Sequence, residues 1–306
     1  MFDTPIAAEP AHPSALTGLE GAVATHAALV SPRLSLSSCV RSYLVRSTLG
    51  VELSPQQRQN HFPASPYCCL MWLLQGGSTC LVRGGLPTFE VLPRLSFIGP
   101  HTGPSVSANP GPVHSFMVVL LPQAAQALTG IDLASLVNRV VPMDSVLDAA
   151  WLAMAQAVQH ATDDDTRVQC IEAFLEPRWR AVCREVMPLA ERQRFWVESL
   201  AMRAATSGMG RSLRQVERRI KDWAGLPLRD LRRLTRSEES FVETRDTFLS
   251  NPAGLAPSWT DVAADGGYSD QSHLCRETRR VSGLSPNGLK RAVAEEESFW
   301  AYRIWG

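Results

Sequence analysis

The sequence lacks the features that would place it in a membrane or in a secretory pathway. It contains no run of about eighteen apolar residues, the shortest stretch expected of a membrane-spanning helix. Its start, MFDTPIAAEP, has no basic segment followed by an apolar one, so an ordinary signal peptide is not indicated. We therefore expect a soluble chain in the cytoplasm, with no membrane as a partner.

Paired metal ligands are also missing. The seven cysteines are an odd number at scattered positions, and the chain has no His-x-His pair. This pattern favours reduced, buried thiols and predicts no metal and no other cofactor. A redox sensor built from Cys68, Cys69 and Cys80 is the less favoured alternative, because adjacent strands would bring the thiols together but no neighbouring charge favours a thiolate.

Short strand-like segments dominate the first half of the 306 residues. CVRSYLV, YCCLMWLLQ, STCLVR, TFEV, LSFIG and HSFMVVLL are separated by Gly-Gly, Pro and Asn-Pro-Gly breaks. Such punctuation predicts an antiparallel sandwich or barrel. Trp72, Phe97 and Phe116 are expected to line an apolar effector cavity in it. The alternative is that the three rings simply fill a packed core.

Helical patterns follow the strands. PQAAQALTG begins with a proline suited to the first turn of a helix, and DLASLVNRVV begins with an aspartate suited to an N-cap. VLDAAWLAMAQAVQHA and RVQCIEAFLEP then carry broad apolar stripes. These stripes can pack on the β half, on the C-terminal half or on a second copy of the chain, which leaves a homodimer open.

A helix, a glycine turn and a second helix are predicted between Trp259 and Pro286. WTDVAAD forms the first helix, Gly266 and Gly267 supply the turn, and Ser269 or Asp270 caps the second helix. On the second helix Leu274, Thr278 and Val281 fall on one side at helical spacing. The residues expected to face outward and contact DNA are Gln271, Ser272, Cys275, Arg276 and Arg279.

The same pattern occurs earlier in the chain, where SLRQVERRI precedes WAGLP much as the later copy precedes GLSP. Leu213, Val216 and Ile220 are predicted to pack inward. The residues expected to read DNA are Arg214, Glu217, Arg218 and Lys221. Arginine can bond guanine twice and glutamate can accept from cytosine. The alternative for Glu217 is an ion pair with Lys221, four residues further on.

Charge is balanced overall but uneven along the chain. Thirty basic and thirty acidic residues give a formal net charge of zero, whereas residues 211–236 hold nine basic residues and three acidic ones. A local excess of this kind suits contacts with DNA phosphates, although charge runs are also common on solvated faces.

These motifs resemble the AraC family of transcription regulators over residues 195–292. The matching positions in the second unit are Gly267, Tyr268, Asp270, Gln271, Ser272, His273, Leu274, Arg276 and Gly283 to Pro286. Thr278 and Leu289 stand where the family usually has Phe and another aromatic residue, which puts the packing of the unit in doubt. The β half is similar to the sensor-like domain that precedes the DNA-binding part in one branch of the family.

The resemblance implies an α+β protein in which a β sandwich or barrel and a helical linker precede an all-α double helix-turn-helix domain. The predicted parts are a flexible tail at 1–30, a β sensor-like domain at 31–142, a helical linker at 143–190 and a DNA-binding domain at 191–306. The implied function is a transcription regulator, with an activator as the expectation and a repressor left open. The expected partners are double-stranded DNA, a small-molecule effector and RNA polymerase.

Two alternatives compete with an effector-controlled regulator. In the first, the protein binds DNA constitutively and the β domain only dimerises. In the second, the β domain is an enzyme that the DNA-binding part targets. Against an enzyme, the β half shows no nucleophile beside a base, no paired acids and no phosphate loop. We predict that the protein is not an enzyme.

Overall fold

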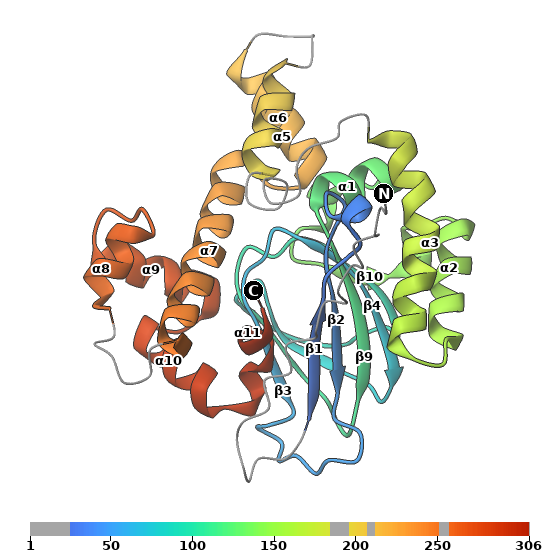
Figure 1. Cartoon of the computed structure of the whole chain (residues 1–306), viewed down its shortest axis with the longest axis horizontal. Helices are drawn as coiled ribbons and strands as arrows, with labels where there is room; N and C mark the ends of the chain where they lie inside the picture. The colour runs from blue at the N-terminus through green and yellow to red at the C-terminus, as the bar shows by residue number, and fades with distance from the viewer. Residues whose placement is uncertain (1–24, 184–195, 207–211, 251–256, 306) are drawn as a thin grey trace, which may run out of the picture.

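The computed structural model combines a β domain with a set of C-terminal helices (Figure 1). It describes residues 25–183, 196–206, 212–250 and 257–305, without the side chains of residues 248–250. Most of the predicted tail, the end of the predicted linker and the turn before Ser212 lie outside these ranges.

Two antiparallel sheets form the β domain. The larger sheet has the order β1-β2-β9-β4-β7-β10, and the smaller one has the order β3-β8-β5-β6. The sheets are separate and open, so the domain is a sandwich and not a closed barrel. The strands are β1 (His26–Val30), β2 (Val40–Ser47), β3 (Gln59–Phe62), β4 (Cys68–Gln75), β5 (Thr79–Arg83), β6 (Leu86–Val91), β7 (Leu95–Ile98), β8 (Ser105–Ala108), β9 (His114–Leu120) and β10 (Val140–Pro142).

Strand β1 corrects the predicted extent of the tail. It pairs antiparallel with β2, from His26 opposite Ser47 to Val30 opposite Tyr43. The composition of this stretch suggested too little apolar surface to fix it in place. Backbone hydrogen bonds to β2 hold it, and its side chains also pack, Ala28 and Val30 against the main core and Ala27 and Leu29 against the cluster around Trp300.

Three helices pack against one face of the larger sheet: α1 (Pro122–Thr129), α2 (Ala149–His160) and α3 (Asp164–Val182). Pro122 starts α1, as predicted, and the side chain of Asp148 accepts hydrogen bonds at the start of α2. The rings of Trp151 and Phe174 join α2 to α3 at 4.9 Å. The indole of Trp72 donates to the carbonyl of Ala155 at 2.9 Å, which ties β4 to α2.

The prediction of a helix in DLASLVNRVV is wrong. Asp132 caps only a short 3-10 turn, η2 (Leu133–Leu136), and the chain then enters β10. Asn138 adopts a φ of 56°, in the left-handed region that ends a helix. The β-branched Val140 and Val141 then pair with β7, where such residues pack well.

The C-terminal half is all helical in its described residues. It contains α5 (Trp196–Thr206), α6 (Leu213–Ala224), α7 (Leu228–Ser250), α8 (Trp259–Asp265), α9 (Gln271–Ser282), α10 (Pro286–Glu295) and α11 (Trp300–Ile304). Short 3-10 turns are η1 (Leu34–Leu36), η3 (Met143–Ser145) and η4 (Glu297–Phe299). The predicted fold class, a β sandwich followed by two helix-turn-helix units in one chain, is confirmed. Among the described helices, none is long and apolar enough to cross a membrane.

Candidate nucleic-acid interface

Helix α9 is the predicted DNA-reading helix of the second helix-turn-helix unit. The side chain of Asp270 accepts a hydrogen bond from the amide of His273 at 2.7 Å, which caps its start. Gly267, in the turn from α8, has a φ of 67°, and Gly283 ends the helix at a φ of 82°. Both values lie in the left-handed region that glycine adopts without strain. The predicted glycine turn and cap are therefore present.

The inner face of α9 packs as predicted. Leu274 is buried among Val262, Ala263 and Tyr268 of the preceding helix and turn. Thr278, which replaces the usual family aromatic residue, is half-buried, and its hydroxyl donates to the carbonyl of Leu274 at 2.9 Å. The smaller side chain therefore leaves no unpaired hydroxyl on the packed face.

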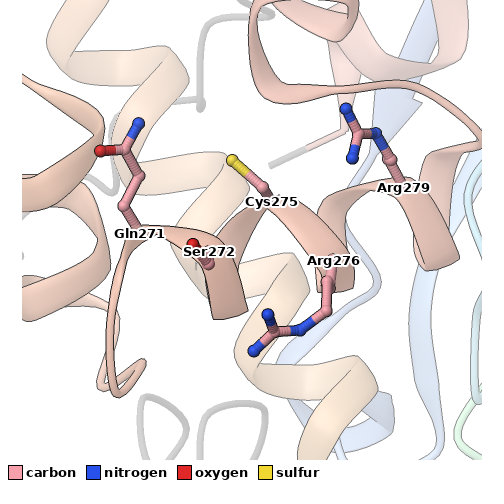
Figure 2. Close-up of a pocket in the computed structure, with 5 residues that line it drawn as sticks. All are labelled: Gln271, Ser272, Cys275, Arg276 and Arg279. Atoms are coloured by element: carbon pink, nitrogen blue, oxygen red, sulfur yellow. The ribbon is translucent and has the colours of Figure 1, made fainter.

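The outer face of α9 presents the five predicted residues together. Gln271, Ser272, Cys275, Arg276 and Arg279 line one hollow on the surface, and Figure 2 shows their side chains extending from the helix. Cys275 is half-buried, and the other four are exposed. No salt bridge joins Arg276 or Arg279 to another described residue, so both guanidinium groups are available to an anion or a base edge.

Helix α6 is the predicted DNA-reading helix of the first helix-turn-helix unit. Ser212 caps its start by accepting from the amide of Gln215 at 3.3 Å, and Gly225 ends it at a φ of 75°. Ile220 is buried and Val216 half-buried, as predicted. Leu213 was predicted to pack inward, which is wrong, because its side chain is 84% exposed. It occupies the first position of the helix, where the described residues offer no apolar surface against it.

Arg214, Glu217, Arg218 and Lys221 all lie exposed on α6. No ion pair joins Glu217 to Lys221 in the described structure, although four-residue spacing allows one. The charged groups of these four side chains are therefore accessible to a ligand. The local positive charge predicted for residues 211–236 extends onto this exposed face, where α6 carries Arg214, Arg218 and Lys221.

The two reading helices are built to the same length. Each has twelve residues between a polar N-cap and a left-handed glycine. Counted from the caps, Arg214, Glu217, Arg218 and Lys221 correspond to Ser272, Cys275, Arg276 and Arg279. The same count pairs Leu213 with Gln271. Sequence reasoning placed Gln271 on a reading face and missed the equivalent position in α6, although counting from the caps would have found it.

Helix α7 holds the two units. Arg232 forms a bidentate pair with Glu198 of α5, with both distances 2.7 Å. Arg233 lies 3.3 Å from Glu277 of α9, and the guanidinium of Arg236 lies 4.8 Å from the ring centre of Tyr268. These arginines therefore hold the units in place, and the excess charge in this segment is only partly available to phosphates.

Both units also contact the β domain. The amide of Ala64 donates to the carbonyl of Val281, at the end of α9, at 2.8 Å. At the end of α6, a Cβ on Gly225 would lie 2.9 Å from the carbonyl oxygen of Leu133, so only glycine allows this approach. The β domain thus touches the C-terminal end of each reading helix.

A large cleft runs between the two sheets and the C-terminal half. Its volume is about 2070 Å³, larger than the roughly 300–1,000 Å³ of common ligand sites. Met71, Leu73 and Met117 line it, from the face of the larger sheet that points away from α2. A ligand would therefore occupy part of this cleft, with the rest filled by solvent.

The three aromatic residues predicted to line an effector cavity lie elsewhere. Trp72, Phe97 and Phe116 are fully buried in the core that includes α2, on the opposite face of the larger sheet, and none of them lines the cleft. Because successive strand residues point to opposite faces, choosing the wrong face exchanges the entire set. The packed-core alternative describes these rings.

Cys69 and His101 of the β domain lie away from water. Burial raises the pKa of the Cys69 thiol to about 12, which disfavours the reactive thiolate. Burial also lowers the pKa of His101 to about 4, while its Nδ1 lies 2.8 Å from the carbonyl of Gly99. The described part of the chain holds no group of three or more His, Cys, Asp and Glu side chains placed for a metal.

An open β sandwich followed by two helix-turn-helix units is the architecture that the resemblance to the AraC family implies. Solved structures of ToxT from Vibrio cholerae are similar to the chain at 11% identity. An apo variant gives a TM-score of 0.38 over 80% of this chain and 95% of that one, and a second structure gives 0.33 over 74% and 95%. No protein-family model and no curated protein matches the sequence.

Proposed function

We propose that the protein is a sequence-specific DNA-binding transcription regulator. The observation that carries this proposal is the pair of equal helices α6 and α9, each with exposed polar side chains at matching positions. A reading helix of this kind enters the major groove and offers its outer side chains to base edges. Arg218 and Arg276 occupy equivalent positions and suit bidentate bonds to guanine.

The charge of the two faces supports DNA over a protein partner. Arg214, Arg218 and Lys221 on α6 and Arg276 and Arg279 on α9 have no salt-bridge partner among the described residues. When unpaired surface cations contact DNA phosphates, they displace the counterions condensed on the DNA. The release of these counterions favours binding to a polyanion. The overall net charge of zero then limits this attraction to the reading faces.

Control by a small molecule is the second part of the proposal. The β domain touches the ends of both reading helices, at Ala64 and Leu133, so a change in this domain reaches both units. The cleft supplies a place for an effector between the sheets and the C-terminal half. As an activator in the cytoplasm, the protein would also meet RNA polymerase.

Selection of bound sites from genomic fragments by the full-length protein tests the DNA-binding part. We expect a recurring sequence, and we expect protection of it to be lost with Arg276→Ala but kept with Arg180→Ala, a control on the exposed surface of α3. Recovery of random fragments by the wild type contradicts the proposal. DNA affinity that stays constant across a metabolite screen favours the constitutive alternative, in which the β domain only dimerises.

A further inference from the structure

The C-terminal segment, residues 296–305, packs Trp305 beside Tyr67 and inserts Trp300 into the β domain. The Trp300 side chain is buried, and its indole N–H donates to Oδ1 of Asn60 at 2.9 Å. The guanidinium of Arg46 lies 5.0 Å from its ring centre, and the ring of Phe62 meets it edge-on at 5.7 Å. We call Arg46, Asn60 and Phe62 the aromatic slot.

A buried positive charge forms one wall of this slot. Arg46 is only 2% exposed, and its terminal nitrogens reach Glu297 at 2.6 Å and the hydroxyl of Thr25 at 2.8 Å. A guanidinium removed from water needs an anion beside it, and Glu297 provides the carboxylate. The Nε of Arg46 has no hydrogen-bond partner in the described structure, so the slot retains one unused donor.

Glu297 is not committed to Arg46 alone. Its other carboxylate oxygen lies 2.9 Å from Arg303 of the same C-terminal segment. If Glu297 left the slot, its charge would keep that partner, whereas Arg46 would need a replacement. The pair is therefore arranged so that an external carboxylate can take the place of the internal one.

The slot opens into the large cleft, because Arg46, Asn60, Phe62 and Trp300 all line it. We propose that the aromatic slot is the site of an aromatic carboxylate, which displaces Glu297 and Trp300. Its acid group pairs with Arg46, its ring takes the cation–π position of the indole, and a ring N–H or hydroxyl donates to Asn60. This inference rests on the proposed function and names the chemical class of the effector.

Displacement of the segment would reach the second reading unit. The indole of Trp305 donates to Glu238 of α7 at 2.9 Å, and the ring of Tyr302 lies 5.5 Å from that of Phe241 on the same helix. The segment thus joins α7 to the β domain. Replacement of Glu297 and Trp300 by a ligand weakens the connection between α7 and the β domain. It thereby changes how α7 positions α9, which it contacts through Arg233 and Glu277.

Isothermal calorimetry on the full-length chain tests the proposal, with indole-3-propionate as the probe and the uncharged indole-3-propionamide as its match. When an internal group competes for a site, the apparent affinity of the ligand equals its intrinsic affinity multiplied by the fraction of sites that the internal group leaves open. We therefore expect Glu297→Gln to bind the acid at least about tenfold more tightly than the wild type. Glu296→Gln, which alters an exposed neighbour, should bind it as the wild type does, and the amide should bind to none of them.

Arg46→Met should abolish binding of the acid, with circular dichroism as the check on its fold. If this variant fails to fold, the comparison of Glu297→Gln with Glu296→Gln still decides. Equal binding of acid and amide, equal affinity in Glu297→Gln and wild type, or no binding to any chain overturns the proposal. Site selection on DNA is a separate measurement, so specific DNA binding without these effects rejects the aromatic slot and leaves the regulator intact.

Discussion

The backbone amide of Ala64 in the β domain donates to the carbonyl of Val281, in the last turn of reading helix α9, at 2.8 Å. The carbonyls in the last turn of a helix have no partner inside it, so this bond satisfies a group that would otherwise need water. It also fixes the end of α9 against the sandwich. The orientation of the second reading helix is therefore set partly by the β domain.

Loss of the reading arginines should weaken specific binding selectively. Arg276→Ala and Arg218→Ala should each cost roughly 1–3 kcal/mol on a selected site, because each removes a bidentate contact with a base. Fluorescence anisotropy at fixed salt measures the loss, with Arg180→Ala as the control. If specific and random DNA lose affinity equally, the two arginines contact phosphates and not bases.

Gly267→Val should destabilise the second unit by roughly 1–3 kcal/mol, since a β-branched residue is strained at a φ of 67°. No atom lies within 4 Å of the added Cβ, so the effect is one of backbone conformation and not of collision. Gly77→Val, also in open space but without a positive φ, is the matched control. Urea unfolding compares the two, and equal stability would show that the turn tolerates a side chain.

Glu238 should contribute more to the free energy of unfolding than an exposed glutamate does. Its carboxylate lies 3.3 Å from Arg41 and accepts from the hydroxyl of Tyr67 at 2.7 Å, with 13% of its side chain exposed. Glu238→Gln should cost roughly 3 kcal/mol in the free energy of unfolding, because the largely buried charge on Arg41 loses the carboxylate beside it. Glu198→Gln, which removes the charge from a pair with Arg232 in which the two side chains are 54% and 53% exposed, should cost less than about 1 kcal/mol. Adding Arg41→Met to Glu238→Gln should recover part of the loss.

His101 should make the β domain sensitive to acid. Burial holds the pKa of its imidazole at about 4, below the ordinary value of 6.5, so the unfolded chain binds the proton more readily. Stability from this group is complete above pH 6.5 and is lost as pH falls towards 4, by about 3 kcal/mol in total. His101→Asn, which keeps a donor towards Gly99, should flatten the dependence between these pH values. An unchanged profile in urea unfolding would contradict this assignment.

The helix-turn-helix half was the more predictable part of the fold. Caps, glycine turns and apolar spacing are local features, and they placed Asp270, Gly267 and Leu274 correctly before any tertiary contact was known. The same local reasoning failed for Leu213, because an apolar residue in the first turn packs only if another element reaches it.

The fold class of the β half was predictable from the sequence. Which face of the larger sheet forms the packed core and which lines the cleft was not. Alternation shows that Trp72 and Met71 point to opposite sides, but it does not say which side later helices will cover. A charged residue inside an apolar strand carried the missing signal. Arg46 in YLVRS shares its face with Leu44, and both line the cleft, whereas Val45 joins the aromatic core.

The equal spacing of α6 and α9 between their caps makes the two proposed recognition surfaces interchangeable in register. Transplanting the outer residues of one helix onto the other requires no insertion or deletion, since Ser212 to Gly225 and Asp270 to Gly283 contain the same number of positions. A chimera with the two sets exchanged would keep both packed faces. Its preferred DNA would carry the two half-sites in reverse order, so the polarity of a promoter element could be inverted by grafting side chains alone.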